Sequence, residues 1–361
     1  MANSRYNIVP VSSDMDAELQ QKIDLKTKPQ GALGQLEAIA KQLGQIQQSL
    51  EPEVVKPHMI VFAADHGVVA QNVSPFPQEV TYQMVLNFLS GGAAVNVFCA
   101  QHNVPLRIVD VGVKSVFEDN NLLSKRKVAN GTRDFTQKAA MTEYEFKAAL
   151  QVGFDEVDRV KTAGSNLVMF GEMGIGNTTT ASCLMSCLTG LSAQSCVGPG
   201  TGSDEAGIAR KAEVIERVKA RLKEDHPREL YRQTVDKLDT QLIAQECGGF
   251  EIIAMTGAML RAAERKVAFV VDGFICSVAF LLAQKLDVNV KGFAIFAHES
   301  EETAHSALLR YLEVTPLLSM SLRLGEGSGA ILALPLIQSA TLFLKNMASF
   351  DSAQVSQEKG E

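Results

Sequence analysis

The amino-acid sequence predicts an α/β protein in which helices cover both faces of a parallel β-sheet. Short, nearly continuous apolar runs alternate along the chain with longer segments of helical periodicity, as in parallel sheets that are buried on both faces. The 361 residues are 46% hydrophobic and 21% charged, which provides for one large domain or two smaller ones. Trp is absent and aromatic residues make up 6%, so we expect an aliphatic core.

The elements follow from apolar spacing, taken in chain order. Residues 14–49 are polar with helical spacing, interrupted at 28–34 by a turn rich in Gly and Pro. Buried strands are expected at 59–64, 106–111, 166–170, 267–271 and 292–297. Helices are expected at 142–163, 178–189, 204–223, 251–265, 275–286 and 329–347. The polar end, 349–361, is expected to fray.

The charge balance excludes some classes of partner. The net charge is −7 and the pI about 5.5, whereas an extended nucleic-acid or anionic-membrane surface needs excess positive charge. The basic cluster at 125–127 has no aromatic neighbours and is interpreted as a solvated turn. The most apolar run, 267–283, contains Asp272 and Gly273, so we expect strand, turn and helix rather than a membrane span. With no signal-peptide pattern at the start, we expect a cytoplasmic protein with neither nucleic acid nor membrane as partner.

The cysteines are expected to be reduced and buried. Six are present, at 99, 183, 187, 196, 247 and 276, and none forms a Cys-x-x-Cys pair. Cys183 and Cys187 are one helical turn apart, but no second pair with metal-site spacing accompanies them. We therefore predict no metal site.

A glycine-rich segment, Gly-Glu-Met-Gly-Ile-Gly-Asn-Thr-Thr-Thr at 171–180, follows the apolar run 167–170. A turn of this kind from strand to helix points backbone N–H groups outward, and the helix dipole favours an anion, typically phosphate. The segment matches neither the triphosphate-binding loop, which ends in Gly-Lys-Ser/Thr, nor Gly-x-Gly-x-x-Gly. Taken alone, it fits a phosphate site and a purely structural turn equally well.

A second glycine-rich segment, at 197–204, has three alternate glycines before another predicted helix, with Ser203 or Asp204 as N-cap. Lys211, about two turns into that helix, would supply a point charge. A flexible loop is the alternative interpretation. Two such loops within about 30 residues favour a phosphate cradle.

A third segment, at 323–330, places Glu326 between glycines just before an apolar helix. Glycine neighbours let a ligand approach the backbone closely. An adjacent apolar wall would raise the pKa of the carboxyl group towards the range of a general base. A capped turn is the alternative.

Two histidine-containing segments also suggest chemistry. Asp65 and His66 end the first strand, where a catalytic dyad or metal site competes with a strand-end turn whose polar groups are satisfied; we favour the turn. His298 and His305 are seven residues apart, which would put them on one face if the segment were helical. No third ligand is evident, so an exposed acidic helix start is the favoured interpretation there.

Taken together, these motifs closely resemble the nicotinate-nucleotide:dimethylbenzimidazole phosphoribosyltransferases. The similarity extends from about residue 24 to 347 and includes several long motifs in the right order. The motifs lie at 28–37, 65–68, 77–81, 171–179, 198–204, 271–274 and 323–330.

The resemblance implies a Rossmann-like three-layer fold and a homodimer. It implies a large α/β domain, 50–325, that carries the phosphate loops, and a smaller helical domain formed by 1–49 with 326–361. It also implies transfer of phosphoribosyl from nicotinate mononucleotide to 5,6-dimethylbenzimidazole. The products are α-ribazole 5′-phosphate, for the lower ligand of cobalamin, and nicotinate. No cofactor or metal is implied.

Site residues follow from the same resemblance. Glu326 would be the general base, and Glu172 would line the same site, facing ribose or base. The phosphate and ribose would be held by Gly174, Gly176, Asn177, Thr178, Thr179, Gly200, Thr201 and Lys211. The base pocket would be walled by Phe76, Gln83, Met84 and Leu324.

The base half of the site departs from some family members. Those members have Ser where this chain has Phe76, and Gln where it has Met84, although Gln83 is adjacent. Adenine, another benzimidazole or a phenolic compound is therefore an alternative acceptor. A nicotinamide-dependent oxidoreductase is disfavoured by the spacing of the first glycine segment. A non-catalytic nucleotide sensor is a further alternative.

Overall fold

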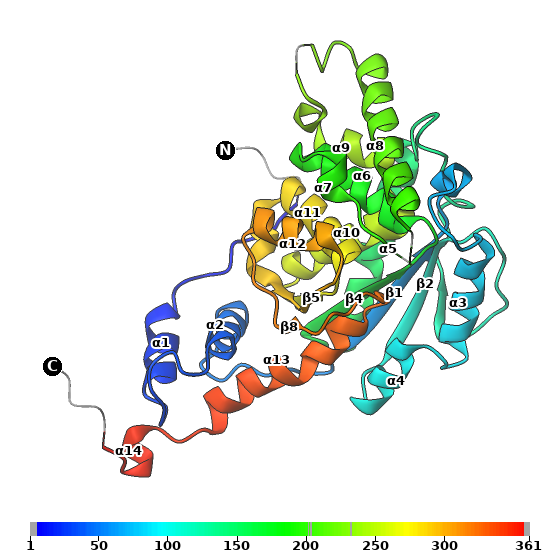
Figure 1. Ribbon diagram of the computed structural model, residues 1–361. Helices are drawn as coiled ribbons and strands as arrows, with labels where there is room; N and C mark the ends of the chain where they lie inside the picture. Colours follow the sequence, from blue (N-terminus) through cyan, green and yellow to red (C-terminus); the bar gives the residue numbers. More distant parts are fainter. Residues whose placement is uncertain (1–5, 201, 203, 232, 357–361) are drawn as a thin grey trace.

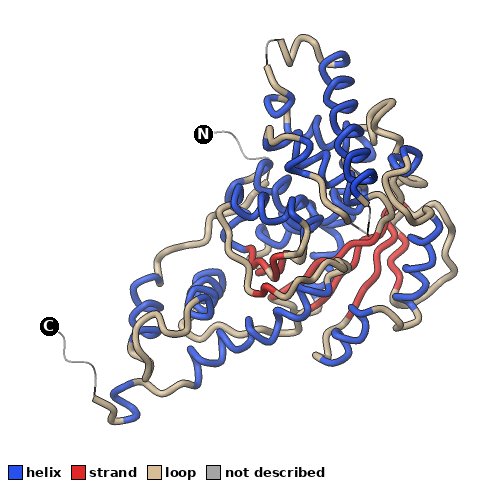
Figure 2. The backbone as a smooth tube through the Cα atoms, viewed as in Figure 1, coloured by secondary structure: helices blue, strands red, loops and turns tan. Residues whose placement is uncertain are grey.

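A six-stranded parallel sheet forms the centre of the computed structural model, which describes residues 6–200, 202, 204–231 and 233–356 (Figures 1 and 2). The strand order is β3-β2-β1-β4-β5-β6. The strands are β1 (His58–Ala64), β2 (Leu106–Gly112), β3 (Leu123–Lys125), β4 (Leu167–Met173), β5 (Ala268–Val271) and β6 (Ala294–Phe296). The α/β class predicted from the sequence is confirmed.

Helices cover both faces of this sheet (Figure 1). On one face α10 (Phe250–Glu264) and α11 (Phe274–Leu286) contact the central strands, and α5 (Glu143–Thr162) packs on α10. The other face is covered by α3 (Glu79–Leu89), α4 (Ala94–Gln101) and α13 (Ser328–Asn346). The core is aliphatic with several buried Phe rings, because the strands are buried on both sides.

A group of helices stands above the carboxyl ends of the strands (Figure 1). It contains α6 (Asn177–Thr189), α7 (Ala193–Cys196), α8 (Glu205–Asp225) and α9 (Thr240–Cys247). The remaining elements are α12 (Thr303–Leu312), the short strands β7 (His298–Glu299) and β8 (Leu318–Ser319), and the 3₁₀ turns η1 (Gly67–Gln71), η2 (Val235–Lys237) and η3 (Val288–Phe293).

The strand order places a topological switch point between β1 and β4. The chain builds outward from β1 to β3 on one side, then returns to build β4 to β6 on the other. In open parallel sheets, ligands bind in the crevice beyond the carboxyl ends of the strands at such a point.

The two terminal segments pack against each other. The helices α1 (Asp16–Asp24) and α2 (Gln35–Gln47) lie beside α13. The Lys26 Nζ donates to the Met347 carbonyl at 2.6 Å, and the Phe350 N–H donates to the Leu25 carbonyl at 3.0 Å. We propose on this basis the smaller helical domain of 1–49 with 326–361, joined to the sheet by α13, which also contacts β4 and α4.

Some local expectations need correction. The expected elements did not include β3, α3, α4, α7 or α9, and the expected strand at 292–297 is shorter because η3 precedes β6. Where a frayed end was expected, α14 (Phe350–Ala353) forms, because the Ser349 hydroxyl accepts from the Ser352 N–H as an N-cap.

Two stretches among the described residues are long and apolar enough to span a membrane by length and composition alone, Glu79–Gln101 and Ser328–Asn346. The first is divided into α3 and α4, and the second packs against α2, α4 and β4. Core helices of globular proteins have the same composition, so these criteria alone do not assign either stretch to a membrane.

Candidate active site

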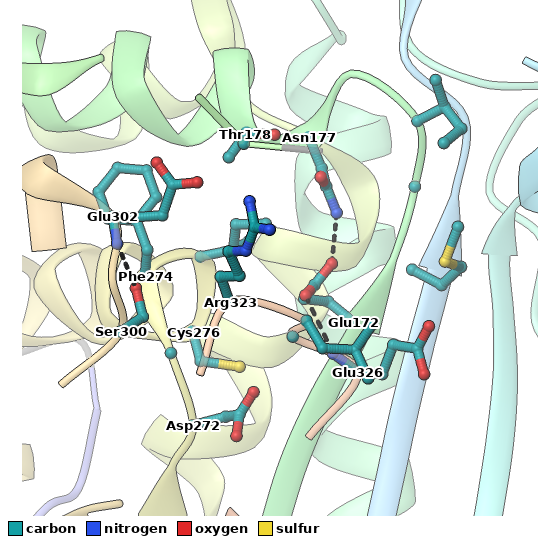
Figure 3. Close-up of a pocket in the computed structure, with 18 of the residues that line it drawn as sticks. Glu172, Asn177, Thr178, Asp272, Phe274, Cys276, Ser300, Glu302, Arg323 and Glu326 are labelled. Carbon is teal, nitrogen blue, oxygen red and sulfur yellow. Dashed lines mark hydrogen bonds between the residues drawn. The ribbon is translucent and has the colours of Figure 1, made fainter. Parts of the chain in front are cut away.

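A cavity of about 360 Å³ lies beyond the carboxyl ends of β4, β5 and β6 (Figure 3). Its walls come from the turn after β4, the loop after β5, the segment after β6, the start of α3 and the loop before α13. The three glycine-rich segments singled out in the sequence, although far apart in the chain, all contribute lining residues. The cavity is therefore placed where the topology predicts a ligand site.

The turn after β4 packs tightly against the end of β1. A Cβ added to Gly174 would lie 2.4 Å from the Ala64 carbonyl oxygen, and Gly176 has a φ of +94°. The Ile175 N–H donates to the Thr81 hydroxyl at 3.0 Å, which ties the turn to α3. Because side chains at these glycines are excluded, the backbone and the start of α6 face the cavity.

Glu172, on β4, is a buried carboxyl group in this cavity. Its oxygens accept hydrogen bonds from the Asn177 amide and, at 3.4 Å, from the Glu326 N–H (Figure 3). Burial, together with the nearby carboxylates of Glu251 and Asp272, raises the pKa of Glu172 to about 8. Its side chain is consequently mostly protonated at neutral pH.

Glu326 has a left-handed backbone with a φ of +64°, between two glycines that also have positive φ. A Cβ on Gly171 would lie 2.4 Å from the Glu326 carbonyl oxygen, and one on Gly325 would lie 2.5 Å from Oε1 of Glu172. The glycines thus let the backbone of the Glu326 loop approach β4 and the Glu172 carboxyl group closely. Burial, aided by the charge of Asp272, raises the pKa of Glu326 to about 7, where a carboxyl group can exchange a proton at neutral pH.

Asp272 holds the Glu326 loop in place, a role that the sequence analysis did not assign. Its carboxylate, directly after β5, accepts from the Gly327 N–H at 3.2 Å and the Ala330 N–H at 2.7 Å. Burial raises its pKa, and His298 lies 3.7 Å away. The carboxylate therefore also caps α13. The Asp-Gly pair after a buried strand was the available sequence signal.

The predicted phosphate residues divide into lining and supporting groups. Gly174, Asn177, Thr178 and Gly200 line the cavity. A Cβ on Gly200 would lie 3.0 Å from the Lys211 Nζ and 3.1 Å from the Thr178 hydroxyl, so these groups converge.

Behind this lining, Lys211 is buried and donates from Nζ to the carbonyls of Gly198 and Pro199, at 3.1 and 3.2 Å. Burial lowers the pKa of Lys211, partly offset by Glu302. Gly176 and Thr179 also lie outside the lining, and the Thr179 hydroxyl has no hydrogen-bond partner among the described residues. Thr201 lies outside the described residues.

All but one of the residues predicted for the base pocket line the cavity. Phe76, Met84 and Leu324 line the cavity, whereas Gln83 is exposed and does not line it. Successive residues on a helix point about 100° apart, so Met84 can face the cavity only if Gln83 faces away. Val80, one turn before Met84, lines the cavity and was missed, although the i, i+4 spacing could have revealed it.

The segment that contains His298 and His305 differs from expectation. His298 is on β7 and His305 on α12, so they do not share a helix face, and both are buried rather than part of an exposed helix start. The chain turns between them, and the Ser300 N–H donates to His305 Nδ1 at 3.0 Å. Burial next to His298 lowers the pKa of His305 to about 3.

His66 instead matches the favoured interpretation of a satisfied strand-end group. Its Nε2 lies 2.7 Å from Glu251 and its Nδ1 lies 2.9 Å from the Thr180 hydroxyl. Other polar lining residues, among them Arg323, His298, Ser300 and Glu302, were not predicted for the cavity. Arg323 belongs to the third glycine-rich segment, whereas the tertiary fold brings the segment with His298, Ser300 and Glu302 to the cavity.

The fold and this cavity define an α/β enzyme with several buried carboxyl groups of raised pKa beside a glycine-rich turn. A family model described as phosphoribosyltransferase matches residues 8–355, and the chain belongs to this family. The chain is 48% identical over 351 residues to the nicotinate-nucleotide–dimethylbenzimidazole phosphoribosyltransferase of Dechloromonas aromatica (strain RCB), covering 97% of this chain and 98% of the relative.

Further similarities agree. The enzyme of the same name from Cupriavidus necator is 48% identical, with 97% of each chain covered. The crystal structure of CobT from Thermus thermophilus superposes with a TM-score of 0.89 at 41% identity, covering 95% of this chain and 99% of that one. A phosphoribosyltransferase fold is thus shared over nearly the whole length.

Proposed function

We propose that this enzyme transfers the phosphoribosyl group of nicotinate mononucleotide to 5,6-dimethylbenzimidazole or a related base. The products would be α-ribazole 5′-phosphate, used in assembly of the nucleotide loop of cobalamin, and nicotinate. The names of the relatives support the reaction. The observation that carries it is Glu326, a buried carboxyl group whose pKa is raised to about 7, facing the cavity beside the Glu172 side chain.

In the proposed mechanism Glu326 accepts the N–H proton of the base. The other ring nitrogen attacks the anomeric carbon with its electron pair. The bond to nicotinate breaks, and its electron pair returns to the pyridinium nitrogen, which becomes neutral. Attack opposite the leaving group inverts the anomeric configuration from β to α. Because the leaving group carries its own positive charge in the donor, its departure needs no separate activation.

Glu172 would complement this step as a neutral acid. With a pKa of about 8 it is mostly protonated when Glu326 is about half ionised at pH 7. A neutral Glu172 can donate a hydrogen bond to ribose or base without adding a second negative charge beside Glu326. Its contact with the backbone N–H of Glu326 ties the Glu326 loop to β4.

The 5′-phosphate would lie at the N-terminus of α6. Gly174, Asn177, Thr178 and Gly200 provide the surface there. Lys211 supports it by holding the carbonyls of the second glycine loop. Gly176 and Thr179 shape the turn, and we assign Thr201 to the same subsite from its motif alone. The N-terminus of α6 favours an anion at this point even though the protein as a whole is acidic.

The acceptor base would lie against Phe76, Met84 and Leu324, and Gln83 is left out of this pocket. An apolar wall suits a dimethyl-substituted ring better than adenine. Incubating the enzyme with nicotinate mononucleotide and equal amounts of dimethylbenzimidazole, adenine and cresol tests this directly. Nicotinate release with dimethylbenzimidazole consumed first is expected. Consumption of another base first would identify a different acceptor, and binding without nicotinate release would indicate a sensor.

We further propose a cytoplasmic homodimer. The outer surfaces of α3 and α4 carry exposed apolar side chains, with Leu86 40% and Val97 56% exposed. Covering such a surface with a second copy would remove it from water. Light scattering on the purified protein distinguishes this state from a monomer. We expect a mass twice that of one chain.

A further inference from the structure

Three cysteine thiols lie close together in the helical group α6–α9 beside the cavity. None of them has a role in the proposed reaction. Cys183 and Cys187 are one turn apart on α6, and Cys247 is the last residue of α9. All three side chains are fully buried, and their Sγ atoms lie within 4.8 Å of one another. The sequence analysis predicted no metal site because a second pair was missing, but the fold supplies a third thiol from another helix.

The spacing of the sulfur atoms is close to that of metal ligands. A thiolate–metal bond is about 2.3 Å, so two thiolates on one ion are separated by about 4 Å. Small rotamer changes would therefore bring the three sulfurs of Cys183, Cys187 and Cys247 around a common centre. Cys247 also donates from Sγ to the Ile243 carbonyl, one turn earlier on α9, at 3.2 Å.

The charge environment supports ligation. The three thiols hydrogen-bond to one another, and the positive charge of Lys219 acts on Cys183 and Cys187. Lys219, on α8, donates from Nζ to the Leu191 carbonyl at 3.4 Å, so it is fixed at the edge of this helical group. A partly buried cation nearby offsets part of the negative charge that thiolate ligands bring.

We propose that Cys183, Cys187 and Cys247 form a three-sulfur site for one soft, thiophilic ion of the Cu(I) class. Soft thiolates select Cu(I), whereas Zn²⁺ in structural sites almost always requires four ligands. Within the described chain this group contains no histidine or carboxylate to complete a tetrahedral set. Each thiol that ligates the ion releases its proton to solvent, three protons for three sulfur–metal bonds.

Such an ion would link α9 to α6, whose first residues face the candidate active site. The test is an anaerobic titration of the native protein with Cu(I) held by a competing colorimetric chelator. We expect one Cu(I) per chain to transfer to the wild type and at least tenfold weaker binding to the Cys247→Ala and Cys183→Ala variants. Cys99→Ala, which removes a buried cysteine on α4 outside the cluster, is the matched control and should bind as the wild type does.

X-ray absorption of the loaded wild type adds a readout independent of activity, with three sulfur neighbours expected. Circular dichroism and thermal unfolding verify that each variant is folded, and Cys187→Ser serves as a second variant should Cys247→Ala unfold. Failure of the wild type to take Cu(I) from the chelator, or equal uptake by the folded cluster variants, would overturn the site. Tighter binding of Zn²⁺ than of Cu(I) would overturn the assignment of the ion.

Discussion

Glu326 owes its proposed role to its surroundings rather than to its residue type. The side chain is only 7% exposed, and Asp272 lies close enough to disfavour its ionisation. The pKa of Glu172 is raised further, because its side chain is buried near three other carboxyl groups. Two neighbouring carboxyl groups with different pKa values provide a proton acceptor and a neutral partner in one cavity.

This difference predicts the pH dependence of the reaction. Glu326 acts as a base only when deprotonated, so kcat/KM should fall about tenfold per pH unit below its pKa of about 7. The measurement is a steady-state pH profile with an acceptor whose own ionisation lies outside the range studied. A profile that stays flat from pH 7 down to pH 5 would contradict the assignment of Glu326 as the base.

At the opposite wall, Phe76 is predicted to set acceptor preference. It is 45% exposed and lines the cavity, so Phe76→Ser removes about 1 kcal/mol of apolar contact. We expect kcat/KM for dimethylbenzimidazole to fall about fivefold relative to adenine in a direct competition. Gln83→Ala, on α3 directly after the Phe76 segment but outside the cavity lining, is the matched control and should leave the ratio unchanged. An unchanged ratio in Phe76→Ser would remove Phe76 from the base pocket.

At the level of elements, glycines set how closely β4 and the loop before α13 approach. Gly171 lies on β4 directly against the backbone of Glu326. A methyl group at Gly171 would be 2.4 Å from that backbone, so the loop would have to move. Displacing a catalytic group by about an ångström can slow turnover about 100-fold.

Gly171→Ala is accordingly expected to lower kcat by about 10- to 100-fold while the secondary structure is kept. Gly92→Ala is the control, because its added methyl would meet only the end of the flexible Asn87 side chain. Steady-state kinetics and circular dichroism of both variants provide the comparison. Equal kcat values for the two variants would show that the close approach is not needed.

The length and burial of each element determine whether it could be predicted from the sequence. Long apolar strands such as β1 and β4 could be predicted, because strands buried on both faces form continuous apolar runs. The three-residue β3 and the helices α3 and α4 could not, because they are short and partly exposed.

Within the site, the three glycine-rich segments could be identified, because the spacing of their glycines is a pattern local to the sequence. The contacts of Asp272 with the α13 N-terminus join residues 55 and 58 positions apart, and no local pattern reports them. Gln83 does not line the cavity although Met84 does, since packing against the sheet fixes which face of α3 is turned to the cavity. The glycine-rich turns could therefore be predicted from the sequence, whereas the contacts that hold them in place depend on the tertiary fold.

At the scale of the whole molecule, the sheet order concentrates buried carboxyl groups at the switch point. Folding must desolvate Glu172, Asp272 and Glu326 together, and all three have raised pKa values as a result. The folded protein holds protons that the unfolded chain would release. The site is therefore a source of instability at neutral pH, a common cost of catalytic groups.

Stability should reflect this cost in a defined pH window. The pKa of Glu326 is about 7 in the folded protein, against an ordinary value of 4.5. Its unfavourable contribution to the stability of the folded state therefore grows as pH increases from about 4.5 to 7. Glu326→Gln should raise the unfolding free energy by about 1–3 kcal/mol at pH 8 and by little at pH 4.5. Urea unfolding of both proteins at these two pH values measures the difference. A gain of equal size at both pH values would contradict the electrostatic origin.

The most direct test of the account is the rate of α-ribazole 5′-phosphate formation by the wild type and by Glu326→Gln. Product from nicotinate mononucleotide and dimethylbenzimidazole is followed by chromatography, with circular dichroism to confirm the fold of the variant. The account predicts rapid product formation by the wild type and a loss of at least about 100-fold in kcat for Glu326→Gln. Near-normal turnover by the folded variant, or no product from the wild type, would contradict it.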